Sequence, residues 1–301
     1  MNKLFTEHGI SFQENVPFAK KGYWRIGGPL RYLAQLEKIS QLTHIAAEAN
    51  TLILGNGSNL LMADQGFSGV AIQLKGDFEQ IKEDGDLWIV GAGVRNAVLL
   101  NRLKKAGRTG LGALAGVPGL VGGAIRMNAG TYLGDIGDRV EWVEWYDGVG
   151  NLYRTTKDEL NFQYRRVDLP WSATILNVAL QTTTENWKEE TESIQKHLER
   201  RKQTQPLNLP SCGSVFKNPE GDYAGRLIES LGLKGHRIGG AEISPKHANF
   251  IVNVDSASAM DVYALIKLAR QRVYRETGFV LEPEVRPEGD WDAGLWPIVL
   301  G

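Results

Sequence analysis

The sequence predicts an α+β protein of two domains. The chain has 301 residues, which is enough for a large buried core and for more than one domain. Strand-like segments in the first two thirds follow one another as hairpins, which favours antiparallel pairing and argues against a doubly wound parallel sheet. Strands and helices alternate in the last third, which is typical of a small α+β domain. We expect the linker at TQPLNLP (204–210), between domains of residues 1–204 and 205–301.

The elements of the first domain follow from local patterns. A short amphipathic helix is expected over 39–49, followed by a strand in TLILG (51–55). A hairpin is expected in 81–94 around Asp84–Gly85, and a second in 140–156 with its turn at Asp147–Gly148. The segment 95–107 reads as a helix that ends at Gly107. A further strand is expected in 172–183, followed by a charged helix over 185–203.

The second domain is predicted in the same way. We expect a strand around Ser214, a helix over 223–230 with Gly232 just past its end, and a strand in NFIVNV (249–254). A long helix is expected to begin after Ser258 and to end at Gly278. Its apolar positions recur at helical spacing and form one stripe of Val262, Leu265, Ile266, Ala269 and Val273.

Composition narrows the class of protein. Lys and Arg number 34 and Asp and Glu 35, so no surplus of charge favours a nucleic-acid partner or an anionic membrane. The single cysteine, Cys212, cannot form an internal disulfide or a thiolate metal site, and the histidines lack metal-ligand spacing, so no metal is expected. The N-terminus has no signal-peptide pattern, and the longest uncharged stretch (109–125) is glycine-rich and short for a membrane span. A cytoplasmic protein is predicted.

Three glycine-rich clusters stand out among the motifs. They are LGNGSNLL (54–61), VGAGVRN (90–96) and the stretch 110–130. Glycine lets the backbone approach a ligand and aim N–H groups at phosphate oxygens. We expect Gly55, Gly57 and Ser58 to hold one phosphate, and Gly122, Gly123 and Ala124 a second, as a diphosphate requires. The alternative is that the clusters are tight turns. A P-loop is absent, and Asn96 stands where a dinucleotide fingerprint needs its third glycine.

Seven motifs in order give the chain a specific resemblance. They are RIGG (25–28), LGNGSNLL (54–61), AGVPGLVGGAIRMNAG (115–130), YRR (164–166), PSCGSVFKNP (210–219), KGHRIGGAEISPKHANFIVN (234–253) and LEPEVR (281–286). Together they resemble the UDP-N-acetylenolpyruvoylglucosamine reductase family, in its shorter (type II) form, over nearly the whole chain. The resemblance implies a two-lobed FAD-binding domain of the vanillyl-alcohol-oxidase (PCMH) type, followed by a small α+β substrate-binding domain.

The activity that the resemblance implies is an oxidoreductase step in peptidoglycan synthesis, and hence in cell-wall biogenesis, cell shape and division. A flavoprotein with non-covalent FAD, and with NADPH as hydride donor, would reduce UDP-N-acetylglucosamine enolpyruvate to UDP-N-acetylmuramate. The expected partner is this small-molecule substrate, with no nucleic acid and no membrane, and the expected state is a monomer.

Three residues carry the chemistry by the same resemblance. Arg165 would bind the substrate carboxylate, because guanidinium holds carboxylate as a planar fork. Ser214 would donate the proton to the carbon beside that carboxylate. Glu284, protonated by burial, would donate a hydrogen bond to the developing enolate, while Glu282 has no assigned role.

The resemblance also implies the residues that bind cofactor and substrate. The cofactor-binding set is Gly55, Asn56, Gly57, Ser58, Asn59, Gly116, Pro118, Gly122, Gly123, Ala124, Asn128, Ala129 and Gly130. The substrate-binding set is Arg201, Gln205, Lys217 and Asn218.

The segment PSCGSVFKNPEG (210–221) poses a choice between two side chains. Cys212 is the stronger acid by intrinsic pKa. Alternation along a strand would put Cys212 and Ser214 on one face, but the cysteine lies at a variable position of the family motif. We therefore expect the serine to do the chemistry and the thiol to pack inertly beside it.

Four positions depart from the usual family pattern. Tyr23 replaces a threonine, Gly112 a glutamate, Leu120 a small hydroxyl residue and Val167 a serine. All four lie among flavin and substrate contacts, so they bear on the fine geometry of the site and not on the three chemical residues.

Two other functions remain open. One is another FAD oxidoreductase of the same fold, acting on a sugar lactone or hydroxy acid, which would leave the motifs of the second domain unexplained. The other is a non-catalytic nucleotide-sugar binding module, which would not need Arg165, Ser214 and Glu284 together and would be colourless.

Overall fold

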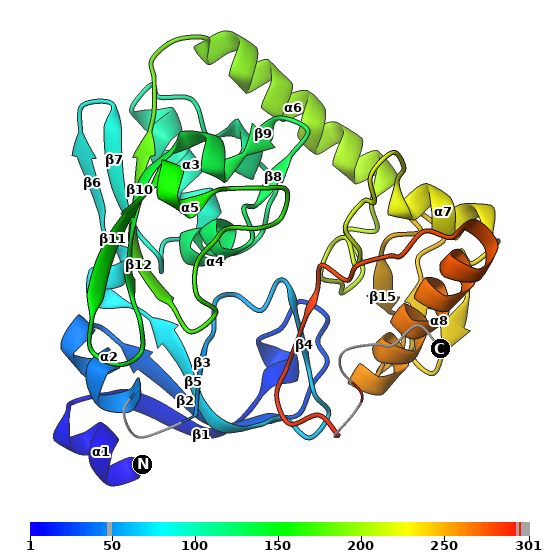
Figure 1. Cartoon of the computed structure of the whole chain (residues 1–301), viewed down its shortest axis with the longest axis horizontal. Helices are drawn as coiled ribbons and strands as arrows, with labels where there is room; N and C mark the ends of the chain where they lie inside the picture. The colour runs from blue at the N-terminus through cyan, green and yellow to red at the C-terminus, as the bar shows by residue number, and fades with distance from the viewer. Residues whose placement is uncertain (47–49, 293–294, 296–301) are drawn as a thin grey trace. The chain divides into compact units, whose positions relative to one another are not determined.

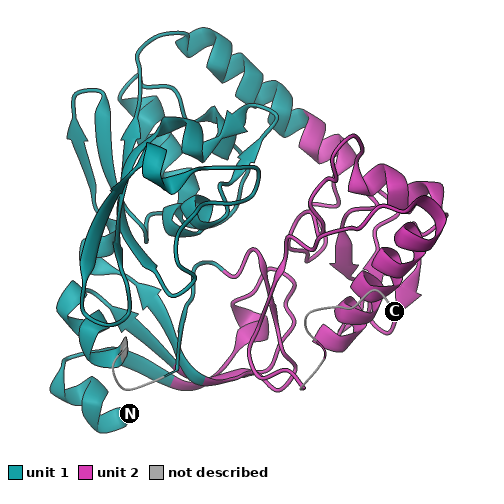
Figure 2. Ribbon diagram, viewed as in Figure 1, with its two compact units in different colours: residues 1–13, 33–56, 69–199 teal, residues 14–32, 57–68, 200–301 magenta. Residues whose placement is uncertain are grey.

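The structure is a computed structural model that describes residues 1–46, 50–292 and 295. The chain divides by contact into two compact units (Figure 2). Unit 1 comprises residues 1–13, 33–56 and 69–199, and unit 2 comprises residues 14–32, 57–68 and 200–301. The segments 14–32 and 57–68 group with the C-terminal part because Trp24, Ile26 and Leu61 belong to its hydrophobic core. The domain boundary at 204/205 stays a prediction.

An antiparallel sheet with the strand order β11-β10-β12-β7-β6 lies in unit 1 (Figure 1). Its strands are β6 (Ile81–Asp84), β7 (Leu87–Gly91), β10 (Val140–Tyr146), β11 (Leu152–Thr156) and β12 (Thr174–Gln181). Both predicted hairpins are confirmed as β6–β7 and β10–β11. The first turn lies one residue later than predicted, because Asp84 pairs with Leu87 and leaves Gly85 and Asp86 at the tip, with Gly85 at a left-handed φ of 58°.

The helices of unit 1 agree with the sequence pattern where that pattern is strong. α3 (Asn96–Lys105) buries Leu99 and Leu103, and Gly107 follows it at a φ of 65°. α6 (Trp187–Thr204), which continues into unit 2, matches the charged helix within two residues at each end. α2 (Ile39–Ala46) is the predicted amphipathic helix, and residues 47–49 of that prediction lie outside the described residues. The short helices α1 (Asn2–Glu7), α4 (Val121–Arg126) and α5 (Lys157–Leu160) were not predicted.

A second sheet has the strand order β1-β2-β5-β3. Its strands are β1 (Ser11–Pro17), β2 (Pro29–Leu36), β5 (Phe67–Leu74) and β3 (Thr51–Ile53), which runs parallel to β5 and is the predicted strand in 51–55. A short ladder pairs β8 (Gly130–Thr131) with β9 (Gly134–Asp135). Among these strands only β3 was expected, since the others carry no strict alternation.

Unit 2 is built around α8 (Ala259–Thr277). The Ser258 hydroxyl accepts from the N–H of Asp261 at 3.0 Å, the Asp261 carboxylate accepts from the N–H of Ser258 at 2.9 Å, and Gly278 ends the helix at a φ of 76°. This capping box fixes the predicted start. The predicted apolar stripe from Val262 to Val273 is fully buried. Against it lie α7 (Ala224–Ser230) and a sheet of β13 (Arg237–Ile238), β14 (Ala241–Ile243) and β15 (Ile251–Asn253), while β4 (Leu60–Met62) pairs in parallel with β16 (Arg286–Glu288).

The predicted strand around Ser214 is wrong. Gly213 takes a left-handed φ of 78°, which interrupts an extended chain, and residues 211–215 are irregular. Phe216 alone forms a bridge, with Pro283. The alternation argument that put Cys212 and Ser214 on one face of a strand therefore falls.

No helix among the described residues combines the length and the apolar character that crossing a bilayer requires.

Candidate active site

Parts of the three glycine clusters meet within unit 1, which contains residues 54–56 of the first cluster. The N–H of Asn96 donates to the carbonyl of Gly119 at 3.1 Å, and the N–H of Val121 donates to that of Val94 at 2.8 Å. These bonds join the second cluster to the third. Gly55 of the first cluster lies against the third, because a Cβ placed on it would come 3.9 Å from the side chain of Leu120. Segments separated by up to about 65 residues thus form one backbone-lined region.

The backbone N–H groups of this region divide into engaged and available ones. Gly122 donates to the carbonyl of Ala92, and Ala124 to that of Leu120, both at 2.9 Å. Those two amides are used inside the protein, contrary to the expectation that they point at a phosphate. The N–H groups of Gly55 and Asn56 reach no acceptor in the described part of the chain. The first cluster therefore offers the donors that an anion needs.

Gly122 and Gly123 lack a side chain for different reasons. A Cβ on Gly122 would lie 2.9 Å from the Cβ of Ala92, so packing alone excludes a side chain there. A Cβ on Gly123 would meet no described atom within 4 Å apart from its chain neighbours and the backbone of its own helix. Open space beside a backbone is what the close approach of a ligand requires. Gly123 is therefore the position of the pair that fits a ligand-facing role.

Asn96 is a residue that the sequence analysis noted only as a mismatch. The residue is 1% exposed, its Nδ2 donates to the carbonyl of Val117 at 3.3 Å, and its Oδ1 has no partner among the described residues. A buried acceptor without a donor is costly unless a ligand or a water completes it. Gly116, which precedes Val117, takes a left-handed φ of 71° and Pro118 follows. This loop and the available amides fit a polar, phosphate-bearing cofactor.

The remainder of the LGNGSNLL cluster (54–61) has a structural task in unit 2. Gly57, at a φ of 63°, accepts from the N–H of Tyr23 at 3.2 Å. Asn59 donates from Nδ2 to the carbonyl of Glu284 at 3.0 Å, and its own carbonyl accepts from the N–H of Arg286 at 3.0 Å. Asn59 thus holds the segment that carries Glu284, whether or not it also contacts a cofactor. Ser58, between them, stays a predicted cofactor residue.

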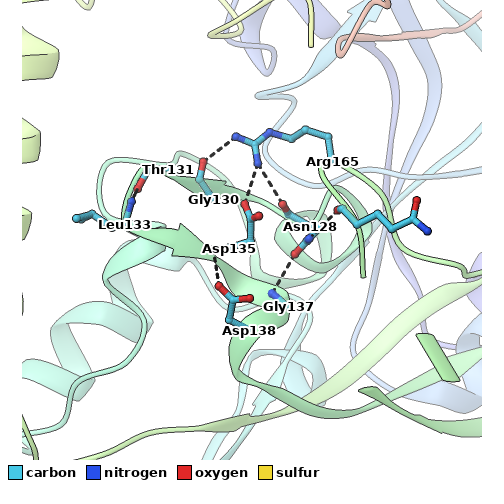
Figure 3. A network of polar contacts seen from close by, with 9 residues as sticks. Asn128, Gly130, Thr131, Leu133, Asp135, Gly137, Asp138 and Arg165 are labelled. Atoms are coloured by element: carbon cyan, nitrogen blue, oxygen red, sulfur yellow. Dashed lines mark hydrogen bonds and ion pairs between the residues drawn. The ribbon is translucent and has the colours of Figure 1, made fainter. Parts of the chain in front are cut away.

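Arg165 lies in a network of polar contacts in unit 1 (Figure 3). Its Nη1 lies 3.0 Å from Oδ1 of Asp135 and donates to the carbonyl of Asn128 at 3.3 Å, and its Nη2 donates to the carbonyl of Gly130 at 2.9 Å. The predicted chemical residue is therefore held by the predicted cofactor segment Asn128–Gly130. Arg165 itself takes a left-handed φ of 55° in a two-residue turn closed by Gln163 and Arg166. Such backbone strain persists only where surrounding contacts enforce it.

Asn128 organises this network. Its side chain is buried, donates from Nδ2 to the carbonyl of Gln163 at 2.7 Å and accepts at Oδ1 from the N–H of Gly137 at 3.0 Å. Ala129 accepts from the N–H of Ile136 at 2.9 Å. These bonds tie the Arg165 turn to the strands β8 and β9. The structure thus gives Asn128 and Ala129 a supporting role, while contact with a cofactor stays a prediction.

Ser214 and Glu284 are brought together in unit 2. Glu284 donates its backbone N–H to the carbonyl of Val215 at 2.8 Å, and Lys217 donates its N–H to the carbonyl of Glu282 at 2.9 Å. The segments 214–217 and 282–285 thus run side by side. Arg165 belongs to the other unit, so its place beside this pair stays a prediction.

Asn249, which the sequence analysis missed, fixes the segment after Ser214. Its Oδ1 accepts from the N–H of Phe216 at 2.9 Å, its Nδ2 donates to the carbonyl of Phe216 at 2.9 Å, and its carbonyl accepts from the N–H of Val215 at 2.8 Å. Asn249 is 4% exposed. One amide side chain therefore replaces a strand ladder. The sequence gives no local signal for this role, because Asn249 stands among other polar residues in KGHRIGGAEISPKHANFIVN (234–253).

The four predicted substrate-binding residues all have protein partners. Arg201 donates from Nε to Oε1 of Gln205 at 2.8 Å, and burial lowers the pKa of that arginine. Lys217 pairs with Glu282 at 2.6 Å, which gives a task to the glutamate that had none. Asn218 accepts from the N–H of Ala224 at 3.1 Å at the start of α7. Their contacts with substrate stay predictions.

Cys212 is a packed thiol, as expected. It is 7% exposed, belongs to the core of unit 2, and its Sγ lies 3.6 Å from the carbonyl of Leu60 and 3.8 Å from that of Gly57. Burial raises its pKa to about 12. A thiol with that pKa is neither a nucleophile nor a ready acid at neutral pH.

The four departures from the family pattern are accommodated locally. Tyr23 is exposed, and its backbone N–H donates to the carbonyl of Gly57. Val167 is buried, and the side chain of Leu120 lies against Gly55. At Gly112 the missing side chain is replaced in space by Glu190 of α6. A Cβ on Gly112 would lie 3.2 Å from Cγ of Glu190, whose Oε2 accepts from the N–H of Gly110 at 2.8 Å.

Metal ligation has no counterpart in the residues that the structure describes, where no group of three or more His, Cys, Asp or Glu side chains is arranged to hold an ion.

Comparison with known proteins agrees with this geometry. A family model described as an FAD binding domain matches residues 30–156, and one described as the C-terminal domain of UDP-N-acetylenolpyruvoylglucosamine reductase matches residues 205–287. UDP-N-acetylenolpyruvoylglucosamine reductase of Moorella thermoacetica is 41% identical over 93% of both chains. That of Anaeromyxobacter sp. (strain Fw109-5) is 41% identical over 93% of this chain and 89% of its own. The crystal structure of the enzyme from Thermus caldophilus matches with a TM-score of 0.80 and 37% identity, over 92% of this chain and 98% of that one.

The fold and the glycine-lined region define an FAD-binding protein of the α+β class with a separate C-terminal domain, as predicted. Within that class the chain belongs to the UDP-N-acetylenolpyruvoylglucosamine reductase family.

Proposed function

We propose that this chain is an NADPH-dependent flavoenzyme that reduces UDP-N-acetylglucosamine enolpyruvate to UDP-N-acetylmuramate, the peptidoglycan precursor. The observation that carries the proposal is the presence of paired segments bearing Ser214 and Glu284 in a chain 41% identical to a reductase of that name. A binding module would not need a hydroxyl donor and a carboxyl group on adjoining segments. The proposal includes a monomer that acts in the cytoplasm on this small molecule.

The cofactor would lie along the glycine-lined region. The N–H groups of Gly55 and Asn56 supply donors to a phosphate, and Gly123 leaves room for close approach. The unpaired Oδ1 of Asn96 supplies an acceptor. When bound, FAD supplies a carrier of hydride between NADPH and the substrate.

The protein side chains would then handle the charge and the proton. Arg165 binds the carboxylate of the enolpyruvyl group and stays charged throughout. As hydride reaches the terminal carbon, negative charge develops on the adjacent carbon and its carboxylate, and a hydrogen bond from a protonated Glu284 stabilises it. Ser214 donates its Oγ proton to that carbon, which completes the lactyl ether.

The test is an anaerobic titration in one cuvette. The visible spectrum of the purified protein is recorded, NADPH is added, and then UDP-N-acetylglucosamine enolpyruvate. Bleaching by NADPH and recovery of the yellow colour with the enolpyruvyl substrate are the expected results. A protein that stays colourless with added FAD would be a binding module. If the flavin bleaches but its colour returns only with oxygen, the protein would act on another substrate.

A further inference from the structure

The carboxylate of Asp135 is a charged partner of Arg165. Oδ1 of Asp135 lies 3.0 Å from Nη1 of Arg165, and the two side chains are 31% and 16% exposed. The same guanidinium also donates to the backbone carbonyls of Asn128 and Gly130. Contacts on both Nη1 and Nη2 fix the plane of the guanidinium as well as its position. No role was predicted for Asp135 from the sequence.

Asp135 is itself rigidly held. It caps the 3₁₀ turn Ile136–Arg139 in a capping box, in which its own N–H donates to Oδ2 of Asp138 at 3.0 Å. It also pairs with Gly130 in the β8–β9 ladder. A Cβ on Gly130 would lie 2.0 Å from Oδ1 of Asp135, so the carboxylate occupies the space that a side chain at 130 would take. The contacts of Asp135 thus fix the position of its carboxylate beside the guanidinium of Arg165 (Figure 3).

The ion pair also lowers the positive charge that a substrate meets. A guanidinium beside a carboxylate forms a neutral pair, so it attracts an incoming carboxylate less than a lone arginine would. Burial raises the pKa of Asp135, and the Arg165 charge opposes that rise. The ion pair itself adds little stability, because a partly exposed pair gains little after desolvation and screening.

We infer that Asp135 is a positioning residue for the reduction, which keeps the guanidinium of Arg165 in its reactive orientation at the expense of ground-state attraction for the substrate carboxylate. The inference rests on the proposed function, since it assigns Arg165 to the substrate carboxylate. Its signature is a split between kinetic constants. Loss of orientation lowers kcat, while gain of net positive charge leaves KM equal or lowers it.

The test compares Asp135→Asn with Asp138→Asn. Both remove one negative charge from the same turn and keep an oxygen acceptor, but Asp135 contacts the guanidinium of Arg165, whereas Asp138 accepts from the N–H of Asp135. We expect Asp135→Asn to slow reoxidation of the reduced flavin by the enolpyruvyl substrate about 10- to 100-fold with KM unchanged or lower. Reduction by NADPH stays at the wild-type rate. Asp138→Asn keeps wild-type constants in both half-reactions.

A second measurement follows how firmly the guanidinium of Arg165 is held, and it does not require turnover. In ¹⁵N-arginine-labelled protein, the Arg165 side-chain signals are assigned by their absence in Arg165→Lys. Slow rotation about Cζ–Nη in the wild type and in Asp138→Asn, and fast rotation in Asp135→Asn, are the expected results. Unchanged rotation in Asp135→Asn overturns the inference, as does a higher KM with unchanged kcat. If the wild type is not reoxidised by the enolpyruvyl substrate, the proposed function fails, and the rotation rates alone decide whether Asp135 holds Arg165.

Discussion

The backbone N–H of Glu284 donates a 2.8 Å hydrogen bond to the carbonyl oxygen of Val215, the residue that follows Ser214. The segments that carry the proposed proton donor and the proposed enolate stabiliser are therefore hydrogen-bonded to each other. Asn59 adds a bond to the carbonyl of Glu284, and Asn249 holds both backbone groups of Phe216. Two buried or part-buried amide side chains thus position the two groups whose spacing decides whether a proton reaches the carbon that needs it.

Replacing Ser214 by alanine should separate the two half-reactions. Without the hydroxyl, no group at this position donates a proton to the substrate carbon, and general acid catalysis contributes about 10²- to 10⁴-fold. We expect NADPH to bleach the flavin at the wild-type rate and the enolpyruvyl substrate to restore it slower by about that factor. Stopped-flow absorbance measures both. Cys212→Ala is the matched control two residues away, and equal slowing in both variants would transfer the role away from Ser214.

Replacing Asn249 by alanine should destabilise the segment that carries Ser214. The change leaves the N–H and the carbonyl of Phe216 buried and unpaired, so we expect a loss of about 2–4 kcal/mol in the free energy of unfolding. Urea unfolding measures it. The exposed Asn208 of the same unit provides the control, since Asn208→Ala should stay within about 0.5 kcal/mol of the wild type. A loss no larger than that of the control would mean that other contacts hold the segment.

Local signals in the sequence were enough for the elements that depend on neighbours along the chain. Both ends of α8 were predicted because a serine such as Ser258 caps a helix N-terminus, and a glycine such as Gly278 readily takes the left-handed conformation that ends a helix. The β10–β11 hairpin was predicted because Asp147 suits a turn, and its Oδ1 accepts from the N–H groups of residues 149–151. The prediction of a strand around Ser214 was wrong because the conformation of that segment depends on the side chain of Asn249. No local sequence pattern connects Asn249 to this segment.

The candidate site was predicted unevenly for the same reason. Motifs identified Arg165, Ser214 and Glu284 as residues, but not what holds them. Asp135 lies 30 residues from Arg165 in the sequence, and an ion pair of that separation has no period or spacing to reveal it. Conversely, the glycine at 122 was interpreted as a phosphate contact although close packing on Ala92 already requires it. A sequence shows that a side chain is missing, but not whether a ligand or the protein fills the space.

The pair Gly122 and Gly123 allows these two reasons to be separated by experiment. Gly122→Ala would place a Cβ 2.9 Å from that of Ala92, so we expect it to cost about 1–3 kcal/mol of unfolding free energy even without cofactor. In Gly123→Ala the new Cβ meets no described atom within 4 Å outside its own helix and chain neighbours, so the apoprotein should be at least as stable as the wild type. FAD affinity, measured by quenching of flavin fluorescence, should fall at least about tenfold, or about 1.4 kcal/mol, in Gly123→Ala.

The outcome that contradicts this assignment is specific. If Gly123→Ala binds FAD like the wild type, the open space beside residue 123 does not face the cofactor. The cofactor bound to the N–H groups of Gly55 and Asn56 would then contact another segment on its other side.

The stability of unit 2 should depend on pH through His247. Burial, with a smaller contribution from the charge of Lys234, lowers the pKa of His247 below its ordinary value of 6.5. Its Nδ1 accepts from the N–H of Asn249 at 3.2 Å, so the folded state favours the neutral ring. The unfolded chain takes up a proton near the ordinary value, whereas the folded chain does so only at lower pH. The contribution to stability is therefore complete above about pH 6.5 and is lost as the pH falls toward the lowered value.

His247→Asn should flatten this acid limb, because the asparagine Oδ1 can accept the same N–H and carries no titrating group. Urea midpoints at pH 7.5, 6.5 and 5.5 should fall more steeply for the wild type than for His247→Asn. His236 is exposed in the same unit, so His236→Asn should follow the wild-type curve. If the wild type and His247→Asn lose stability in parallel, the acid sensitivity arises from other groups, and the partly buried imidazole does not couple protonation to the segment that Asn249 holds beside Ser214.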